Sequence, residues 1–204
     1  MTRLFLIRHG RTAWNAVERY RGREDLPLDE VGQLQAKALA DGFAAVRLAA
    51  VYSSPLQRAW HIAQAIAATQ GLDVRLHDGL LDIDYGQWQG LSPEEARARF
   101  PQLFRDWEEQ PQKVRFPGGE GLAEVRERAV AALEDVARRH SGASVALVSH
   151  RVVCQVMMCA MLGLDDSRFW QLVPDVASVQ TLEHDGERFR VTSFNDTCHL
   201  RSFQ

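Results

Sequence analysis

The chain has 204 residues, which suits a single domain (1–204), and its 46% hydrophobic and 25% charged residues are those of an ordinary globular protein. A net charge of -3 gives no reason to expect nucleic acid or a membrane as a partner. Cys154, Cys159 and Cys198 form no metal-ligand spacing. No signal peptide precedes the first predicted strand and no apolar run approaches membrane length, so we expect a cytoplasmic protein with reduced thiols.

The first predicted element is a buried strand over residues 4–7, followed at once by Arg8, His9 and Gly10. A short apolar run without polar alternation is typical of a parallel strand that is covered on both faces. Open α/β sheets bind ligands at the carboxyl ends of such strands, so Arg8 and His9 are candidate site residues. His9 can act as a base, a metal ligand or a nucleophile, and the planar fork of Arg8 fits phosphate or carboxylate.

A charged loop with glycine and proline follows at 17–28, and Asp29 is expected to cap a helix over about 30–43. The apolar stripe of this helix is predicted to consist of Val31, Leu34, Ala38 and Leu39. A short strand is expected at 49–52.

A second helix is predicted after that strand, with Ser54 as its N-cap and Pro55 at its first helical position. It runs to about residue 69, before Gly71, and a possible edge strand follows at 74–76. Arg58 falls in the first turn of the helix, where an anion is favoured and an arginine adds a bidentate clamp.

The acidic and aromatic stretch 81–90 is predicted to be a strand that runs into a loop. Ser92 then begins a capping-box pattern, and a proline- and glycine-rich insert with short helical pieces follows. We interpret residues 92–121 as a cap-like insert over the pocket.

The last part of the chain alternates between helices and strands. A long helix is predicted at about 122–139, a buried strand at 144–149, an apolar helix at 152–162, and a hairpin of strands at 179–183 and 188–194. The fold class is therefore α/β, a three-layer sandwich with a mainly parallel central sheet flanked by helices.

Two buried strands end in the same way, one in Arg8 and His9 and the other in Ser149 and His150. If these strands are neighbours in the sheet, both imidazoles face one crevice. Together with Arg58 they would form an anion pocket of phosphate size, to which Asp82 or Asp84 would supply an acid.

Few carboxylates are available as ligands near this pocket, and its arginines would repel a cation, so no metal site competes well. The sequence contains no glycine-rich phosphate loop and no G-x-S-x-G elbow. Metal-free phosphoryl transfer to a histidine remains as the reaction.

Several motifs follow one another at a spacing that is typical of one family: Arg8-His9-Gly10-x-Thr12-x-x-Asn15, Gly22-Arg23-x-Asp25-x-Pro27-Leu28, Ser53-Ser54-Pro55-Leu56-x-Arg58-Ala59, Gly86-x-Trp88-x-Gly90, Gly118-Gly119-Glu120, Ser149-His150 and Asn195-Asp196-Thr197-x-His199-Leu200. Over essentially its whole length the sequence resembles the histidine phosphatase superfamily, the phosphoglycerate mutase-like proteins. Within that superfamily it is similar to the short α-ribazole phosphatase and broad-specificity types.

The resemblance implies that His9 attacks phosphorus and becomes phosphohistidine, with no metal or other cofactor. It also implies that the phosphate is held by Arg8, Arg58, His150, Asn15 and the backbone N–H of Arg151. Arg21 and Gly22 match the substrate-side loop of the family, although Arg19, Arg21 and Arg23 also fit a solvated loop face. Trp60 and Trp170 are expected in the core.

The general acid departs from the family pattern, which usually has Glu four residues before the glycine of Gly86-x-Trp88-x-Gly90. Asp82 stands there and has roughly 1.5 Å less reach, against the ~3 Å that proton transfer needs. Asp84, two residues on and on the same face of an extended strand, is the alternative acid.

The resemblance implies a metal-independent phosphomonoesterase that acts on small phosphorylated metabolites through phosphohistidine. The alternatives are a cofactor-dependent phosphoglycerate mutase and a regulatory phospho-ligand binder. The expected partner is a small-molecule phosphate monoester; α-ribazole 5′-phosphate, phosphoserine and sugar phosphates all remain open. An exposed edge strand would allow a homodimer.

Overall fold

The computed structural model describes residues 1–203 of the chain, and it is built around one six-stranded sheet with the order β3-β2-β4-β1-β5-β6. The pairs β3–β2, β2–β4 and β4–β1 are parallel, whereas β1–β5 and β5–β6 are antiparallel. The strands are β1 (Thr2–Arg8), β2 (Ala50–Ser53), β3 (Val74–Leu76), β4 (Ser144–Ser149), β5 (Val179–His184) and β6 (Phe189–Asp196).

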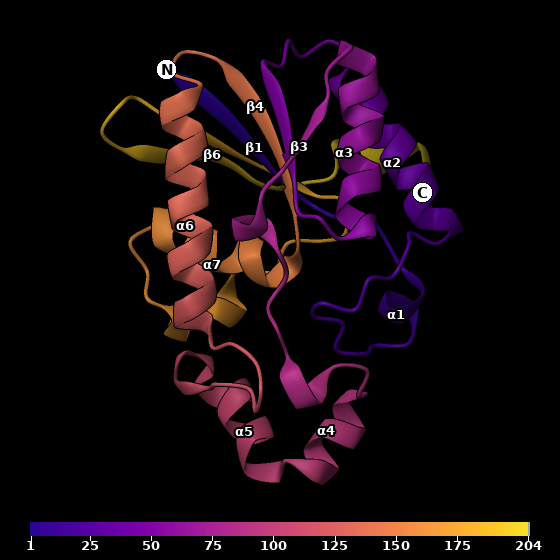
Figure 1. Cartoon of the computed structure of the whole chain (residues 1–204), viewed down its shortest axis with the longest axis vertical. Coiled ribbons are helices and arrows are strands. Elements are labelled where there is room, and N and C mark those ends of the chain that lie inside the picture. Colours follow the sequence, from indigo (N-terminus) through magenta and orange to yellow (C-terminus); the bar gives the residue numbers. More distant parts are fainter. Residues whose placement is uncertain (204) are drawn as a thin grey trace.

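Helices cover both faces of the sheet (Figure 1): α2 (Glu30–Phe43) and α3 (Gln57–Gln70) lie on one face, and α6 (Leu122–Arg139) and α7 (Arg151–Met161) on the other. Successive side chains of a strand point to opposite faces. Leu4 and Leu6 accordingly join the core under α6 and α7, while Ile7 joins the core under α2 and α3. This arrangement confirms the predicted three-layer α/β sandwich.

Three further helices lie beyond the carboxyl ends of β1 and β4 (Figure 1): α1 (Ala13–Ala16), α4 (Pro93–Arg99) and α5 (Pro101–Glu109). Helix α4 begins with the predicted capping box, in which the Ser92 hydroxyl accepts a hydrogen bond from the Glu95 N–H at 3.2 Å. Within residues 1–203, no helix combines the length and apolarity that crossing a membrane requires.

The predicted apolar stripe of α2 is partly wrong, because Val31 and Leu34 are 37% and 49% exposed. The first turn of α2 packs through Gly32 against the backbone of Arg11, so closely that a Cβ on Gly32 would lie 2.1 Å from the Arg11 carbonyl oxygen. Gly32 therefore faces inward, and the buried face continues through Gln35, Ala36, Leu39 and Phe43.

Helix α3 begins at Gln57, later than Ser54 and Pro55 predict. The Ser54 hydroxyl contacts the His150 ring nitrogen Nε2 at 2.8 Å, and the carboxylate of Asp25, in a distant loop, accepts the Gln57 N–H at 2.7 Å. Ser54 thus serves the site instead of capping the helix, while Arg58 still falls in the first turn.

The stretch 81–90 is not a strand, contrary to the prediction. Its neighbourhood contains two 3₁₀ turns, Asp78–Leu80 and Gly86–Trp88, joined by irregular backbone. Side chains and loop backbone, rather than a neighbouring strand, bond to this stretch. The Ser149 hydroxyl donates to the Leu80 carbonyl at 2.7 Å, the Glu120 carboxylate accepts the Asp84 N–H at 2.9 Å, and the Glu120 N–H donates to the Asp84 carbonyl at 2.9 Å.

Candidate active site

The ends of β1 and β4 bring two buried histidines together, as the sequence predicts. Arg8 pairs with Ser149 in the parallel ladder, and the His9 N–H donates to the Ser149 carbonyl at 2.9 Å. The ring centroids of His9 and His150 are 5.2 Å apart, and neither residue has exposed surface.

His9 is held with one ring nitrogen free. Its Nδ1 lies 2.6 Å from the Gly10 carbonyl oxygen, and because that oxygen can only accept, Nδ1 carries the proton. Nε2 is buried and has no hydrogen-bond partner within residues 1–203. Burial, followed by the charges of Arg58, Arg21 and Arg8, lowers the pKa of His9 well below 6.5. His9 is therefore neutral near pH 7, with its Nε2 lone pair available.

His150 is oriented by two partners and is also neutral. Arg58 donates from Nε to Nδ1 of His150 at 3.2 Å, so the other ring nitrogen, Nε2, carries the proton and faces the Ser54 hydroxyl. Burial and then the Arg58 charge lower the pKa of His150 well below its ordinary value.

Arg58 connects three segments through one fully buried guanidinium. It donates to the Gly22 and Glu24 carbonyls, each at 2.7 Å, and to the Asp82 carboxylate at 3.1 Å. Burial lowers the pKa of Arg58 and the Asp82 charge opposes that shift. Gly22, expected to contact substrate, thus positions Arg58 through its carbonyl oxygen.

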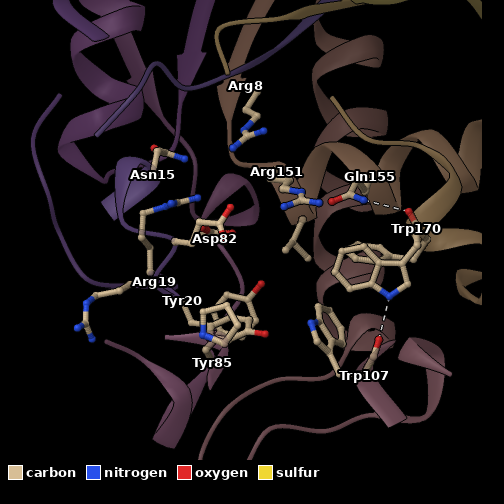
Figure 2. A pocket seen from close by; sticks show the side chains of 15 residues that line it. Arg8, Asn15, Arg19, Tyr20, Asp82, Tyr85, Trp107, Arg151, Gln155 and Trp170 are labelled. Carbon is tan, nitrogen blue, oxygen red and sulfur yellow. Dashed lines mark hydrogen bonds between the residues drawn. The ribbon is translucent and has the colours of Figure 1, made fainter. Parts of the chain in front are cut away.

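A cavity of about 400 Å³ opens beside these groups (Figure 2). Of the predicted site residues, Arg8, Asn15, Arg21, Asp82 and Arg151 line it, while His9, Arg58 and His150 adjoin it through Asp82 and the strand ends.

Unpaired cationic donors gather around this cavity. The Nε atoms of Arg8, Arg21 and Arg151 are buried and have no hydrogen-bond partner within residues 1–203. Burial, followed by the charges of Arg21 and Arg151, lowers the pKa of Arg8 to about 9. Such a set of cations would be stabilised by an anion and would repel a metal ion.

The structure separates the two candidate acids. Oδ2 of Asp82 faces Arg58 and lies 3.7 Å from Nδ1 of His150. Asp84 does not line the cavity: its carboxylate accepts the Gly86 N–H at 2.8 Å and lies 3.8 Å from Arg23. The expectation that the two share a strand face is wrong because this stretch is irregular.

Several lining residues were not predicted from the sequence. Trp170, expected in the core, lines the cavity, and its indole N–H donates to the Trp107 carbonyl at 2.8 Å (Figure 2). Gln155 lies four residues after Arg151 on α7, and this spacing places both side chains on the same face of the helix. Once Arg151 is predicted at the site, the spacing therefore indicates Gln155 as well. The other such residues are Glu18, Tyr20, Tyr85, Pro93, Trp107, Val152 and Phe169.

The arginines of the loop at 17–28 were expected either to contact substrate or to form a solvated loop face, and the structure shows both. Arg21 is mostly buried and lines the cavity, whereas Arg23 is 41% exposed and pairs with Glu120 at 3.3 Å. Arg19 lines the cavity rim and pairs with Glu95 at 3.1 Å.

Comparison with known proteins identifies the family. The model of the histidine phosphatase superfamily (branch 1) matches residues 4–197. The chain belongs to this superfamily. The match spans the strand ends, the Arg58 helix and the Asp82 loop alike, so this histidine phosphatase is an enzyme that hydrolyses phosphomonoesters.

Three relatives illustrate the similarity. Phosphoserine phosphatase 1 of Hydrogenobacter thermophilus is 42% identical over 100% of this chain and 96% of its own length. The structure of Bacillus stearothermophilus YhfR has a TM-score of 0.95 and 32% identity, covering 98% of this chain and 100% of its own. A phosphoserine phosphatase from Entamoeba histolytica, solved in complex with phosphoserine, has a TM-score of 0.89 and 26% identity, covering 98% and 100%.

The buried neutral histidines predict that the phosphatase loses stability in mild acid. An unfolded histidine binds a proton near pH 6.5, whereas folded His9 and His150 bind theirs only at much lower pH. The unfolded state then holds more protons, so the free energy of unfolding falls as pH drops below 6.5, by about 1.4 kcal/mol per pH unit for each histidine. Urea unfolding between pH 7.5 and 5 measures this slope.

His9→Ala isolates one contribution, because the other titrating groups remain in place. We expect the variant to lose about half of the slope that the two buried histidines cause. His61→Ala, on α3 outside the site, should keep the wild-type slope. An unchanged slope in His9→Ala would show that His9 does not stay neutral in the folded protein.

Proposed function

We propose that this histidine phosphatase dephosphorylates phosphoserine, with His9 as the nucleophile. The observation that carries the proposal is the free Nε2 lone pair of a neutral His9 beside a cavity lined by unpaired arginine donors. A neutral imidazole can attack phosphorus while the cations bind the dianion that would otherwise repel it.

The phosphate oxygens are assigned to the arginines and to neighbouring neutral donors. Asn15 uses Oδ1 to accept from Thr12, at 3.0 Å for both the N–H and the hydroxyl, which leaves its NH₂ group for the cavity. Arg151 is the first residue of α7, where a backbone N–H has no partner in its own helix. Arg8, Arg58 and His150 complete the phosphate-binding set.

The reaction proceeds in two steps that balance. Nε2 of His9 forms a bond to phosphorus as the ester P–O bond breaks, and the Asp82 carboxyl gives its proton to the departing serine oxygen. In the second step the Asp82 carboxylate takes a proton from water, which attacks phosphorus and breaks the P–N bond. Inorganic phosphate leaves and His9 is restored.

The substrate assignment begins from relatives that are named as phosphoserine phosphatases, at 42% and 26% identity. Besides its phosphate, phosphoserine carries a carboxylate and an ammonium group. The arginines supply donors for the carboxylate, and Arg21 and Arg151 are the ones we assign to it. Arginines cannot accept a hydrogen bond, so the ammonium group needs a different partner.

Gln155 provides a buried acceptor for that ammonium group. Its NH₂ group donates to the Phe169 carbonyl at 2.9 Å, and because that oxygen can only accept, the amide orientation is fixed (Figure 2). Oε1 of Gln155 is thereby left buried, without a hydrogen-bond partner within residues 1–203, on a side chain that lines the cavity. An unsatisfied buried acceptor favours a ligand that brings a donor.

The assignment of His9 as the nucleophile can be tested directly. In EDTA, phosphate release from phosphoserine should persist, and His9→Ala should lower it by about 10³-fold or more. After an alkaline quench, mass spectrometry should find one phosphoryl group on the peptide that contains His9. Phosphate release by His9→Ala at the wild-type rate, or a phosphoryl group on another residue, would contradict the assignment, and His61→Ala serves as the active control.

The assignment of Gln155 to the ammonium group predicts a loss of activity that depends on the substrate. Gln155→Leu should lower kcat/KM for phosphoserine by about 10- to 100-fold, the size of a lost hydrogen bond to a charged group. The effect on 3-phosphohydroxypropionate, which lacks the ammonium group, should be small. Equal losses on both compounds in Gln155→Leu would contradict ammonium recognition.

A further inference from the structure

Arg128 lies on helix α6 and does not line the cavity. Its side chain binds backbone carbonyls of the segment 78–84. Its Nη1 donates to the Gly79 and Leu81 carbonyls at 3.1 and 2.6 Å, and its Nη2 donates to the Asp82 carbonyl at 3.1 Å. A single guanidinium therefore satisfies three backbone carbonyls of this segment.

Glu120 completes the contact and fixes the orientation of Arg128. Its two carboxylate oxygens accept from Nε and Nη2 of Arg128, each at 3.0 Å, so that the guanidinium makes five hydrogen bonds in all. Oε2 of Glu120 also accepts the Asp84 N–H at 2.9 Å. Burial alone would raise the pKa of Glu120, but the bonds from Arg128 and Asp84 outweigh it and the pKa is lowered, so Glu120 stays ionised.

Close backbone packing confines the same segment from two sides. A Cβ on Gly79 would lie 2.8 Å from the Arg128 carbonyl oxygen, and a Cβ on Gly119 would lie 2.2 Å from the Asp84 carbonyl oxygen. Because neither position has room for a side chain, the segment lies directly against α6 and against the turn that carries Glu120.

The position of this backbone determines where the Asp82 carboxyl lies. An aspartate carboxyl is separated from its Cα by a single methylene, so the side chain has little freedom to compensate for a backbone shift. Oδ1 accepts the Ile83 N–H at 3.0 Å, which leaves Oδ2 directed at Arg58 and His150.

We propose that Arg128 and Glu120 are positioning residues that hold Asp82 at the distance needed for proton transfer to the leaving group. The proposal rests on the role of Asp82 as general acid in the proposed function. It requires the planar five-donor fork of arginine, because a lysine ammonium cannot hold three carbonyls and two carboxylate oxygens in one plane.

The test compares two leaving groups in an Arg128→Lys variant. Phenol leaves poorly and needs a proton, whereas p-nitrophenol leaves well without one. kcat/KM reports the steps up to loss of the leaving group. We expect Arg128→Lys to lower kcat/KM for phenyl phosphate by about 10²-fold, the cost of a misplacement of about 1 Å, and to change that for p-nitrophenyl phosphate little.

Two variants calibrate the measurement. Asp82→Asn should show the same selective loss on phenyl phosphate, and adding Arg128→Lys to it should cause no further selective loss, because the two act through one carboxyl. Arg126→Lys is the matched control. Arg126 lies on the same helix but donates to Asp166 and to the Leu164 carbonyl, at 2.7 and 2.9 Å. Its substitution should leave the ratio of the two kcat/KM values unchanged.

The outcomes separate the positioning role from the proposed function. Equal losses on both substrates in Arg128→Lys, with a selective loss in Asp82→Asn, would overturn the positioning role alone. No selective loss in Asp82→Asn would overturn Asp82 as the acid and the positioning role with it. If Arg128→Lys does not fold, Glu120→Gln, which removes the charge opposite Arg128, decides the question by the same ratio.

Discussion

The buried guanidinium of Arg58 is the contact on which the rest of the site depends. Removing a charge from water costs several kcal/mol unless hydrogen bonds and an opposite charge compensate. Arg58 obtains that compensation from segments that are far apart in the sequence: the Gly22 and Glu24 carbonyls, the Asp82 carboxylate and the His150 ring. Each segment is thereby fixed relative to the others, and the Asp82 carboxylate is oriented toward the strand ends that carry the histidines.

The charged side chains around Arg58 carry an excess of positive charge that a bound dianion would neutralise. Arg8, Arg21 and Arg58 share one small region with Asp82, and burial lowers the pKa of each of these arginines. The mutual repulsion of these buried arginines lowers the stability of the folded protein, which is typical of a binding site. Neutral histidines avoid adding to the repulsion. A dianion would relieve it, so phosphate binding and folding stability are coupled through the same groups.

The parts of the fold that follow backbone periodicity could be predicted from the sequence, including helices 30–43 and 122–139 and the neighbouring strands that end in His9 and His150. The segment 81–90 could not, because its backbone is bonded by Arg128 and Glu120, which lie more than 30 residues away. Its acidic and aromatic pattern fits an extended strand equally well. For the same reason the sequence could not separate Asp82 from Asp84.

The same distinction explains why the reaction class could be predicted from the sequence while the substrate could not. The proposed phosphate-binding and nucleophilic groups follow regular strand ends and helix starts, in local motifs that the family shares. The remainder of the cavity is lined by side chains from the loop at 18–21, from helices α4 and α5, and from the 3₁₀ turn Asp166–Gln171, together with Gln155 of α7. No local pattern joins these segments; tertiary packing alone brings Trp107 and Trp170 together. The selectivity for a carboxylate and an ammonium group that we propose thus depends on the fold, whereas the proposed attack on phosphorus depends on the motifs.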